Sequence, residues 1–203
     1  MRLDSRDALS SVYAKPTRMI RDKALPRLDK HSRHFIALSP FFCLRSSAAD
    51  GTGDVSPRGG EPGFVQVLDD TQIAFPDRPG NNRLDTLTNM VENPKVGMLF
   101  FLPGVEEMLR LNGSATITTE GALMQRFVHE GKRPRSVIVI AIQDVYFHCS
   151  KALKRSALWN PEKHVPPGGF PTLGQIARDQ IGFPLPSRLI DMALRHDAKK
   201  NLY

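Results

Sequence analysis

The sequence has few of the residues that mark a disulfide framework, a metal site or a membrane span. Its two cysteines, Cys43 and Cys149, lie far apart in apolar, strand-like surroundings, so we expect buried free thiols. The longest apolar runs, 96–102 and 137–142, are much too short to cross a bilayer as helices. Residues 1–18 hold no apolar run of the signal-peptide kind. We therefore expect a cytoplasmic protein without a membrane partner.

Several common ligand-binding motifs are also absent. The sequence contains no G-x-x-x-x-G-K-[ST] phosphate loop, no G-x-G-x-x-G dinucleotide motif and no H-E-x-x-H zinc motif. His31 and His34 are interpreted as surface histidines, so no metal site is expected. Basic stretches at 126–135 and 195–200 lack interleaved aromatic residues, which argues against a nucleic-acid partner. The formal charge of +7 is compatible with a phosphorylated small molecule, although its sign alone does not choose among anionic partners.

Closely spaced turn and strand signals fill the middle of the chain. Asp50-Gly51 is typical of a tight hairpin, because both residues tolerate the positive φ angles of such turns. Six or seven short strands separated by short helices favour a mainly β fold with a closed barrel. We divide the chain into an N-terminal arm (1–26), a barrel (27–160) and a C-terminal helical extension (161–203). Strands are predicted at 41–45, 54–58, 64–68, 72–75, 96–102, 108–118 and 137–149, and helices near 28–36, 83–92, 120–129, 150–159, 172–181 and 187–199.

The loop that joins the strand ending at Phe75 to the next helix is a candidate anion site. Asn81 or Asn82 can cap the helix, whose first turn offers free N–H donors and the positive end of its dipole. The guanidinium of Arg83 matches two phosphate oxygens, and Arg78 could add a second cation. An ordinary capped helix with solvated arginines explains the same residues equally well.

Three further segments carry candidate ligand contacts. Pro57-Arg58-Gly59-Gly60 follows a strand, and its glycines would let the backbone approach a flat ligand, although a wide turn is the simpler explanation. Alternation puts Arg110 beside Met108 on one strand face, where it would reach a ligand or form a salt bridge. Lys151 and Arg155 lie four residues apart before Trp159, which fits an anion site or a solvated basic face.

These segments together resemble the pyridoxamine 5′-phosphate oxidase-like FMN-binding split-barrel family, in particular a bacterial subgroup of probable FMN-dependent enzymes. The resemblance covers about residues 30–160 and rests on several strings in the right order. They are DVSPRGGEPGFVQVLDD at 54–70, PDRPGNNRLD at 76–85, NPKVGMLF at 93–100, LRLNG at 109–113 and CSKALKRSALW at 149–159.

The resemblance implies a six-stranded split barrel that forms a homodimer with FMN at the interface. It also implies an FMN-dependent oxidoreductase that takes electrons from a small molecule or a nicotinamide. The alternatives are a non-enzymatic flavin-binding or sensing protein, and a haem-binding barrel with His129 or His148 as iron ligand. The implied cofactor-binding residues are Pro57, Arg58 and Gly59 beside the flavin ring, Phe75, Pro76, Asp77 and Arg78 along the ring or ribityl chain, Asn82 and Arg83 at the phosphate, Met108 and Arg110 on a flavin-facing strand, and Lys151, Arg155 and Trp159 in a closing turn.

The tail departs from the oxidases of this family that produce pyridoxal phosphate. Those enzymes hold substrate with an Arg-x-His pair, whereas Arg195 and His196 are adjacent here. We therefore do not expect vitamin B6 oxidase activity.

Overall fold

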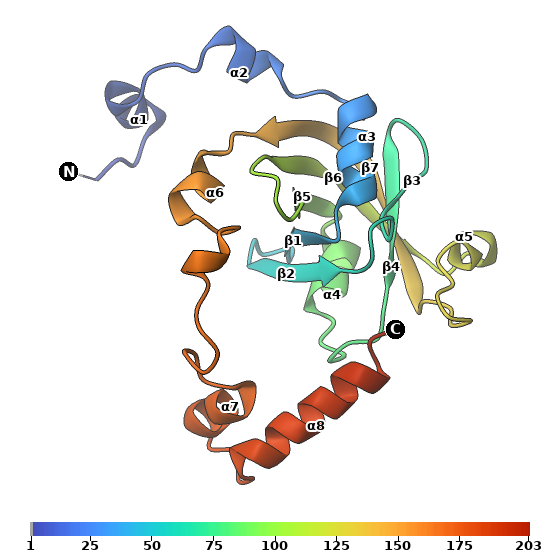
Figure 1. The fold of residues 1–203 in the computed structure, drawn as a ribbon. Coiled ribbons are helices and arrows are strands. Elements are labelled where there is room, and N and C mark those ends of the chain that lie inside the picture. The colour runs from blue at the N-terminus through green and yellow to red at the C-terminus, as the bar shows by residue number, and fades with distance from the viewer. Residues whose placement is uncertain (1) are drawn as a thin grey trace.

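A seven-stranded antiparallel sheet dominates the structure, a computed structural model that describes residues 2–203 (Figure 1). The order of the strands in the sheet is β2-β1-β5-β6-β7-β4-β3. The predicted mainly β fold with short helices is correct. The count is seven rather than six because of β3, which has only two residues. The strands are β1 Phe41–Ser47, β2 Gly53–Gly59, β3 Gln66–Val67, β4 Gln72–Asp77, β5 Lys95–Phe101, β6 Met108–Thr118 and β7 Ser136–His148.

The helices are short and lie outside the sheet, with α4 packed against β1 and β6. They are α1 Arg6–Val12, α2 Arg18–Asp22, α3 Lys30–Leu38, α4 Asp85–Glu92, α5 Gly121–Gln125, α6 Lys151–Ser156, the 3-10 helix Pro161–Lys163, α7 Leu173–Ile181 and α8 Ser187–Lys200.

The sheet curls but does not close. In the described part of the chain β2 pairs only with β1, and β4 pairs with β7 and the short β3. The edges of the sheet are β2 and β3, so the barrel is split between β2 on one side and the paired strands β3 and β4 on the other. Pro57 belongs to the edge strand β2, a place where the missing backbone N–H of proline breaks no interior ladder. The split leaves backbone edges open to a ligand.

The predicted hairpin connects β1 and β2. Gly51 has φ of 89°, and the backbone N–H of Ala48 donates to the carbonyl oxygen of Thr52 at 2.9 Å. This confirms the turn expected from Asp50-Gly51. The hairpin sets the register in which Phe42 faces Arg58 and Cys43 faces Pro57.

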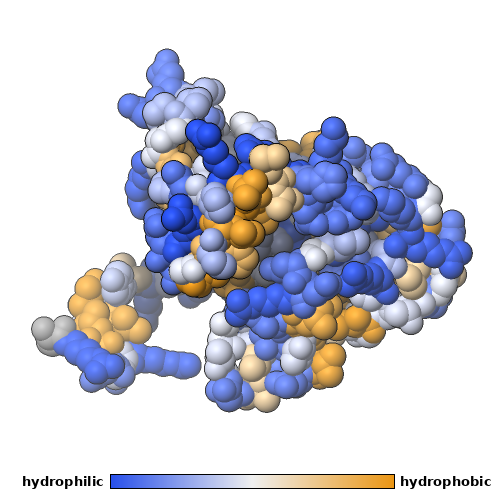
Figure 2. Space-filling model, turned by 90° about the horizontal axis from the view of Figure 1, so that it is seen from below, coloured by the Kyte–Doolittle hydropathy of each residue, from blue (hydrophilic) through white to orange (hydrophobic). Residues whose placement is uncertain are grey.

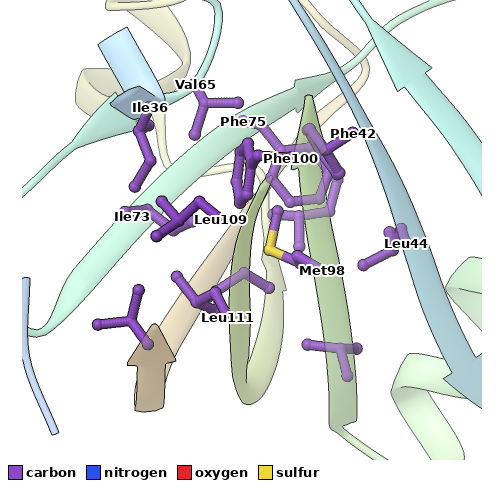
Figure 3. Packing of buried hydrophobic residues seen from close by; sticks show 14 of the residues in the cluster. Ile36, Phe42, Leu44, Val65, Ile73, Phe75, Met98, Phe100, Leu109 and Leu111 are labelled. Carbon is purple, nitrogen blue, oxygen red and sulfur yellow. The ribbon is translucent and has the colours of Figure 1, made fainter. Parts of the chain in front are cut away.

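Aromatic and aliphatic side chains together fill the centre of the barrel (Figure 3). Phe42 is fully buried, and its ring centroid lies 5.7 Å from that of Phe64, 5.1 Å from Phe75 and 5.0 Å from Phe100. On β6 the predicted alternation holds from Leu109 to Leu111, since both leucines are buried and Arg110 between them is exposed. Met108 departs from it, because it is buried although it was predicted to share the face of Arg110. The core therefore fixes which side of each strand faces outward.

Gly113 allows the paired strands β6 and β7 to approach closely at a β-bulge. The pairing of β6 with β7 shifts register between Asn112 and Gly113. A Cβ at Gly113 would lie 2.3 Å from the carbonyl oxygen of Ala141. Only glycine fits this β-bulge without a backbone shift.

The two cysteines form no disulfide. Cys43 is half-buried, as expected of a thiol on the outer face of β1. Cys149 is exposed, so the prediction that both thiols are buried was wrong. It directly follows the last residue of β7, beyond the part of the strand that packs on the core.

Helices α1 and α2 before the barrel and helices α7 and α8 after it lie away from the sheet, and the chain after α8 returns to the barrel (Figure 1). Helices α7 and α8 pack closely on each other, since a Cβ at Gly174 would lie 2.4 Å from the carbonyl oxygen of Ser187. Helices α1, α7 and α8 carry exposed apolar side chains, including Val12, Ile181 and Met192. On the face seen in Figure 2 such side chains form separate patches on a mainly hydrophilic surface. Within residues 2–203, no helix combines the length and the apolar character needed to cross a membrane.

Candidate functional site

A cleft lies at the split of the barrel and has a volume of about 470 Å³. This size is typical of small-molecule sites. One wall comes from the end of β2 and the following loop, and the opposite wall comes from β4 and the segment after α5. The residues that line this split cleft are Pro57, Arg58, Gly59, Gly60, Glu61, Pro62, Gly63, Phe64, Gln66, Pro76, Arg78, Pro79, Gly80, Arg126, Phe127, Val128, His129, Leu202 and Tyr203.

The charge of the split cleft is mainly positive. Arg58, Arg78 and Arg126 line it, against the single carboxylate of Glu61. None of the three arginines is in an ion pair with a described residue. Arg78 donates to the carbonyl oxygen of Phe127 at 2.9 Å, and its partial burial lowers its pKa. The cleft therefore offers cationic groups that an anionic ligand can engage.

Backbone and ring surfaces form the flat part of the split cleft. Gly60 packs against Phe64 so closely that a Cβ would lie 2.8 Å from Cγ of that ring. Phe64 in turn stacks on the buried Phe42, with 10° between the ring planes. A planar ligand would therefore meet a wall that the aromatic core supports from behind.

Asp77, at the end of β4 and next in sequence to the cleft residue Pro76, is partly buried. Burial raises its pKa above the usual 3.8, and the nearby positive charges of Arg58 and Arg135 oppose that rise. Asp77 does not itself line the cleft. The carboxylate of Asp77 therefore acts on a ligand only indirectly, through its electrostatic interaction with Arg58 and Arg135.

The loop after β4 is built differently from the predicted capped helix. Helix α4 begins at Asp85 after Leu84, which makes no side-chain cap, so the prediction that Asn81 or Asn82 caps it was wrong. Instead the Asn81 side chain accepts from the backbone N–H of Arg83 at 3.0 Å. Asn82 takes a left-handed φ of 56° and accepts from Arg135 Nη1 at 2.6 Å. The asparagines stabilise the turn before the helix rather than its first residue.

Arg83 is exposed and pairs with the side chain of Asp85. The hydrogen bond that Arg83 Nε donates to Asp85 and the charge of that carboxylate raise the pKa of Arg83. An anion would have to compete with Asp85 for the guanidinium of Arg83.

A buried polar contact joins helix α4 to strand β2. Thr86 is 5% exposed, and its Oγ1 lies 2.7 Å from Asp54 Oδ2 and 3.0 Å from Ser56 Oγ. Asp54 and Ser56 are on the same strand as the cleft residues Pro57 and Arg58. The contact links the loop before α4 to one wall of the cleft.

The structure brings together five of the predicted site residues and places the others elsewhere. Pro57, Arg58, Gly59, Pro76 and Arg78 all line the split cleft. Phe75 and Met108 are buried, and Phe75 belongs to the core. Asn82 and Arg83 lie on the loop that follows the cleft residue Gly80.

Arg110 faces the outer side of the sheet. Its guanidinium lies 5.6 Å from the ring of Tyr146, so it forms a cation–π contact rather than the salt bridge considered above. It lines a second, smaller hollow of about 320 Å³ with Cys43, Val55, Leu99 and His148.

The closing turn predicted at 151–159 forms helix α6 and lies apart from the split cleft. Lys151 and Arg155 are exposed, which agrees with a solvated basic face. Trp159 is partly buried, and its indole Nε1 donates to the carbonyl oxygen of Val105 at 2.9 Å.

Two parts of the cleft were not predicted. They are the segment Arg126–His129 after α5 and the residues Leu202 and Tyr203 after α8. The basic stretch 126–135 was recognised, but no local pattern shows that it folds against β4. The contact of Tyr203 with Arg78 joins distant parts of the chain, which a single sequence does not reveal.

Comparisons with known proteins point to one family. The family model for pyridoxamine 5′-phosphate oxidase matches residues 28–149. A search of curated proteins finds no relative of this chain. Among solved structures, HupZ from Group A Streptococcus is similar, at 17% identity and a TM-score of 0.48, with 59% of this chain and 93% of that chain covered. An FMN-binding protein from Syntrophomonas wolfei aligns at 15% identity and a TM-score of 0.46, covering 58% of this chain and 83% of the other.

A further similar structure is General Stress Protein 26 from Bacillus anthracis, at 16% identity and a TM-score of 0.43, with 58% of this chain and 93% of that chain covered. The family model matches more than half of the 203 residues and includes the whole sheet. The chain belongs to the pyridoxamine 5′-phosphate oxidase family.

Proposed function

We propose that the chain binds FMN in the split cleft and acts as an FMN-dependent oxidoreductase. The observation that carries this proposal is the cleft itself, a cationic site with glycine-rich walls at the open edge of the barrel. A planar ring system fits against the backbone of Pro57–Gly59 and beside Pro76. The arginines of the cleft, and Asn82 and Arg83 on the loop after it, would bind the phosphate. FMN carries two negative charges on its phosphate at neutral pH, and the surplus of arginine in the cleft complements them.

The residues of the cleft would bind and orient the cofactor, while bound FMN supplies the hydride and electron chemistry. Arg58 would supply the positive charge that stabilises reduced flavin. Its side chain makes only a long contact, at 3.4 Å, with the carbonyl oxygen of Pro57, so its charge is available to a ligand. A guanidinium near the electron-accepting end of the ring stabilises negative charge that develops on reduction.

A homodimer is the second part of the proposal. The outer face of β1, β5 and β6 carries Cys43, Leu99 and Arg110 around a shallow hollow, and such a face can accept a second copy. Met108 and Arg110 would then serve the partner's cofactor rather than that of their own chain. Sedimentation should give twice the 22.7 kDa of one chain, and a species of 22.7 kDa alone would refute this part.

Titration with FMN tests cofactor binding. The purified chain should absorb at about 450 nm or gain that band with added FMN, whereas haem would give a band at about 400 nm. Replacing Arg83 by Ala should weaken FMN binding, because a charged contact to the phosphate would be lost. Arg18→Ala is a matched control, because Arg18 also forms an exposed ion pair, with Asp22, but lies on the N-terminal arm. Equal affinities of both variants for FMN would remove Arg83 from the site.

Anaerobic reduction separates an enzyme from a binding protein. NADH, NADPH or another small-molecule donor should bleach the bound flavin if the chain is an oxidoreductase. A flavin that stays oxidised with every donor would instead support a flavin-binding or sensing protein. Vitamin B6 oxidation is not proposed, since Arg195 and His196 lie on α8 and neither lines the cleft.

A further inference from the structure

The residues after α8 return to the barrel and cover one end of the split cleft. Helix α8 ends at Lys200, and the end of the described chain lies beside the base of β4 (Figure 1). Leu202 and Tyr203 both line the cleft, and Tyr203 is partly buried there. The barrel core described above contains neither residue. Tyr203 is therefore held by the cleft and not by the core.

Three side chains hold Tyr203 in place. The centroid of its ring lies 3.9 Å from that of His129, with 32° between the two planes. The guanidinium of Arg78 lies 5.4 Å from the ring centroid, within cation–π range. Lys132 Nζ donates to the carbonyl oxygen of Tyr203 at 2.8 Å. These groups recognise a flat aromatic ring and a hydrogen-bond acceptor next to it.

The surroundings of Tyr203 are built independently of the tail. His129 and Lys132 exchange two backbone hydrogen bonds, of 3.0 and 2.9 Å, across a two-residue turn. Both turn residues have positive φ, 47° for Glu130 and 76° for Gly131, as in the tight turns of β-hairpins. Arg78 is fixed from the other side by its bond to the carbonyl oxygen of Phe127. The backbone that carries His129 and Lys132, and the side chain of Arg78, would thus keep their positions if Tyr203 left.

We propose that Arg78, His129 and Lys132 form a binding subsite for a planar aromatic ligand with an anionic or acceptor group, and that Tyr203 is its internal occupant. The subsite is the end of the split cleft next to the proposed flavin position, so its role as a substrate site rests on the proposed function. An external ligand has to displace Tyr203. Because the tail is tethered, it competes at a high effective concentration and sets a threshold for ligand entry.

Binding of N-acetyl-L-tyrosine to the chain without FMN tests the subsite directly. This probe carries the ring of Tyr203 and a free carboxylate for Lys132. If the tail fills the subsite in about 90% of molecules, its removal strengthens apparent binding about tenfold. The variant Tyr203→Ala should therefore bind the probe about tenfold more tightly in calorimetry than the unmodified chain. Tyr13→Ala alters an exposed tyrosine of the arm and should leave the affinity for the probe unchanged.

A second substitution shows where the probe binds. Adding His129→Ala to Tyr203→Ala should abolish most of the gain, because the stacking partner is lost. N-acetyl-L-alanine, which lacks the ring, should not bind either variant. If Tyr203→Ala binds the probe no more tightly than the unmodified chain, or if His129→Ala leaves the gain intact, the subsite proposal is wrong.

Fluorine NMR follows the displacement in the unmodified chain. Labelling with 3-fluorotyrosine gives one signal for each of the three tyrosines, and Tyr203→Phe assigns the signal of Tyr203. The probe should move that signal towards the shift of free 3-fluorotyrosine and leave the Tyr13 signal in place. An unmoved Tyr203 signal at saturating probe would overturn the proposal. FMN titration is a separate measurement, so failure of flavin binding and failure of the subsite can be told apart.

Discussion

Gly60→Ala is the change that most directly probes how the barrel core supports the cleft. An added Cβ would lie 2.8 Å from Cγ and 2.9 Å from Cβ of Phe64. Ordinary carbon–carbon contacts are about 3.5–4.0 Å, so one partner has to move by roughly 0.7 Å or more. Phe64 has little room to move, because its ring lies against the fully buried Phe42. Such overpacking costs about 1–3 kcal/mol, and we expect the free energy of unfolding to fall by that amount.

Urea unfolding of matched variants measures this effect. Gly53→Ala is the control, since Gly53 begins β2, the strand that Gly60 directly follows, and a Cβ at Gly53 meets nothing within 4 Å. We expect that substitution to change the free energy of unfolding by less than about 0.5 kcal/mol. If the wall is shared with FMN, Gly60→Ala should also weaken flavin binding. A Gly60→Ala chain as stable as Gly53→Ala would refute the claim that Phe64 is pressed between the wall and the core.

Three further substitutions probe the core, the periphery and the charge near the cleft. Phe42→Ala should lower the free energy of unfolding by about 3–5 kcal/mol in urea, because the ring is fully buried among three other phenylalanines, and a loss under about 1 kcal/mol would contradict this packing. Trp159→Phe removes the donor to the Val105 carbonyl and should cost about 0.5–1.5 kcal/mol, measured in the same way; an unchanged value would show that the bond contributes nothing. Asp77→Asn removes a carboxyl whose pKa is raised above 3.8 by burial. The contribution of this carboxyl to the stability of the fold is present below pH 3.8 and is lost as the pH rises through the raised pKa. The gain in free energy of unfolding of the variant over the unmodified chain should therefore be larger at about pH 7 than at about pH 4. A gain that does not vary with pH would contradict the raised pKa.

The sequence predicted the elements well wherever local patterns determine them. Strand β6 was expected at 108–118 and is found as Met108–Thr118, because alternation of buried and exposed residues is strong on a strand with one side in the core. The tight turn at Asp50-Gly51 was predictable from a different local pattern, because Gly51 has the positive φ that favours glycine.

The site was only partly predictable, since local patterns do not fix long-range contacts. The asparagines at 81 and 82 had the right chemistry for a helix cap, yet Asn82 binds Arg135, which lies far along the chain. The family resemblance assigned Pro57 and Pro76 to one cofactor site, and both residues line the split cleft. The far end of the cleft, with His129 and Tyr203, depends on how the helices after the barrel fold back, and no pattern within either segment encodes that return.

The contact of Thr86 with Asp54 and Ser56 has a consequence for the cost of binding. Because it is buried and joins α4 to β2, the wall at Pro57 and the loop that precedes α4 are held at a fixed separation before any ligand arrives. A ligand that touches both ends then loses its own freedom on binding but does not have to order the protein. In Thr86→Val the two elements would be free to drift apart, and affinity for a long ligand would fall more than affinity for a short one. Thr86 would thus act as a spacer that favours ligands of one length.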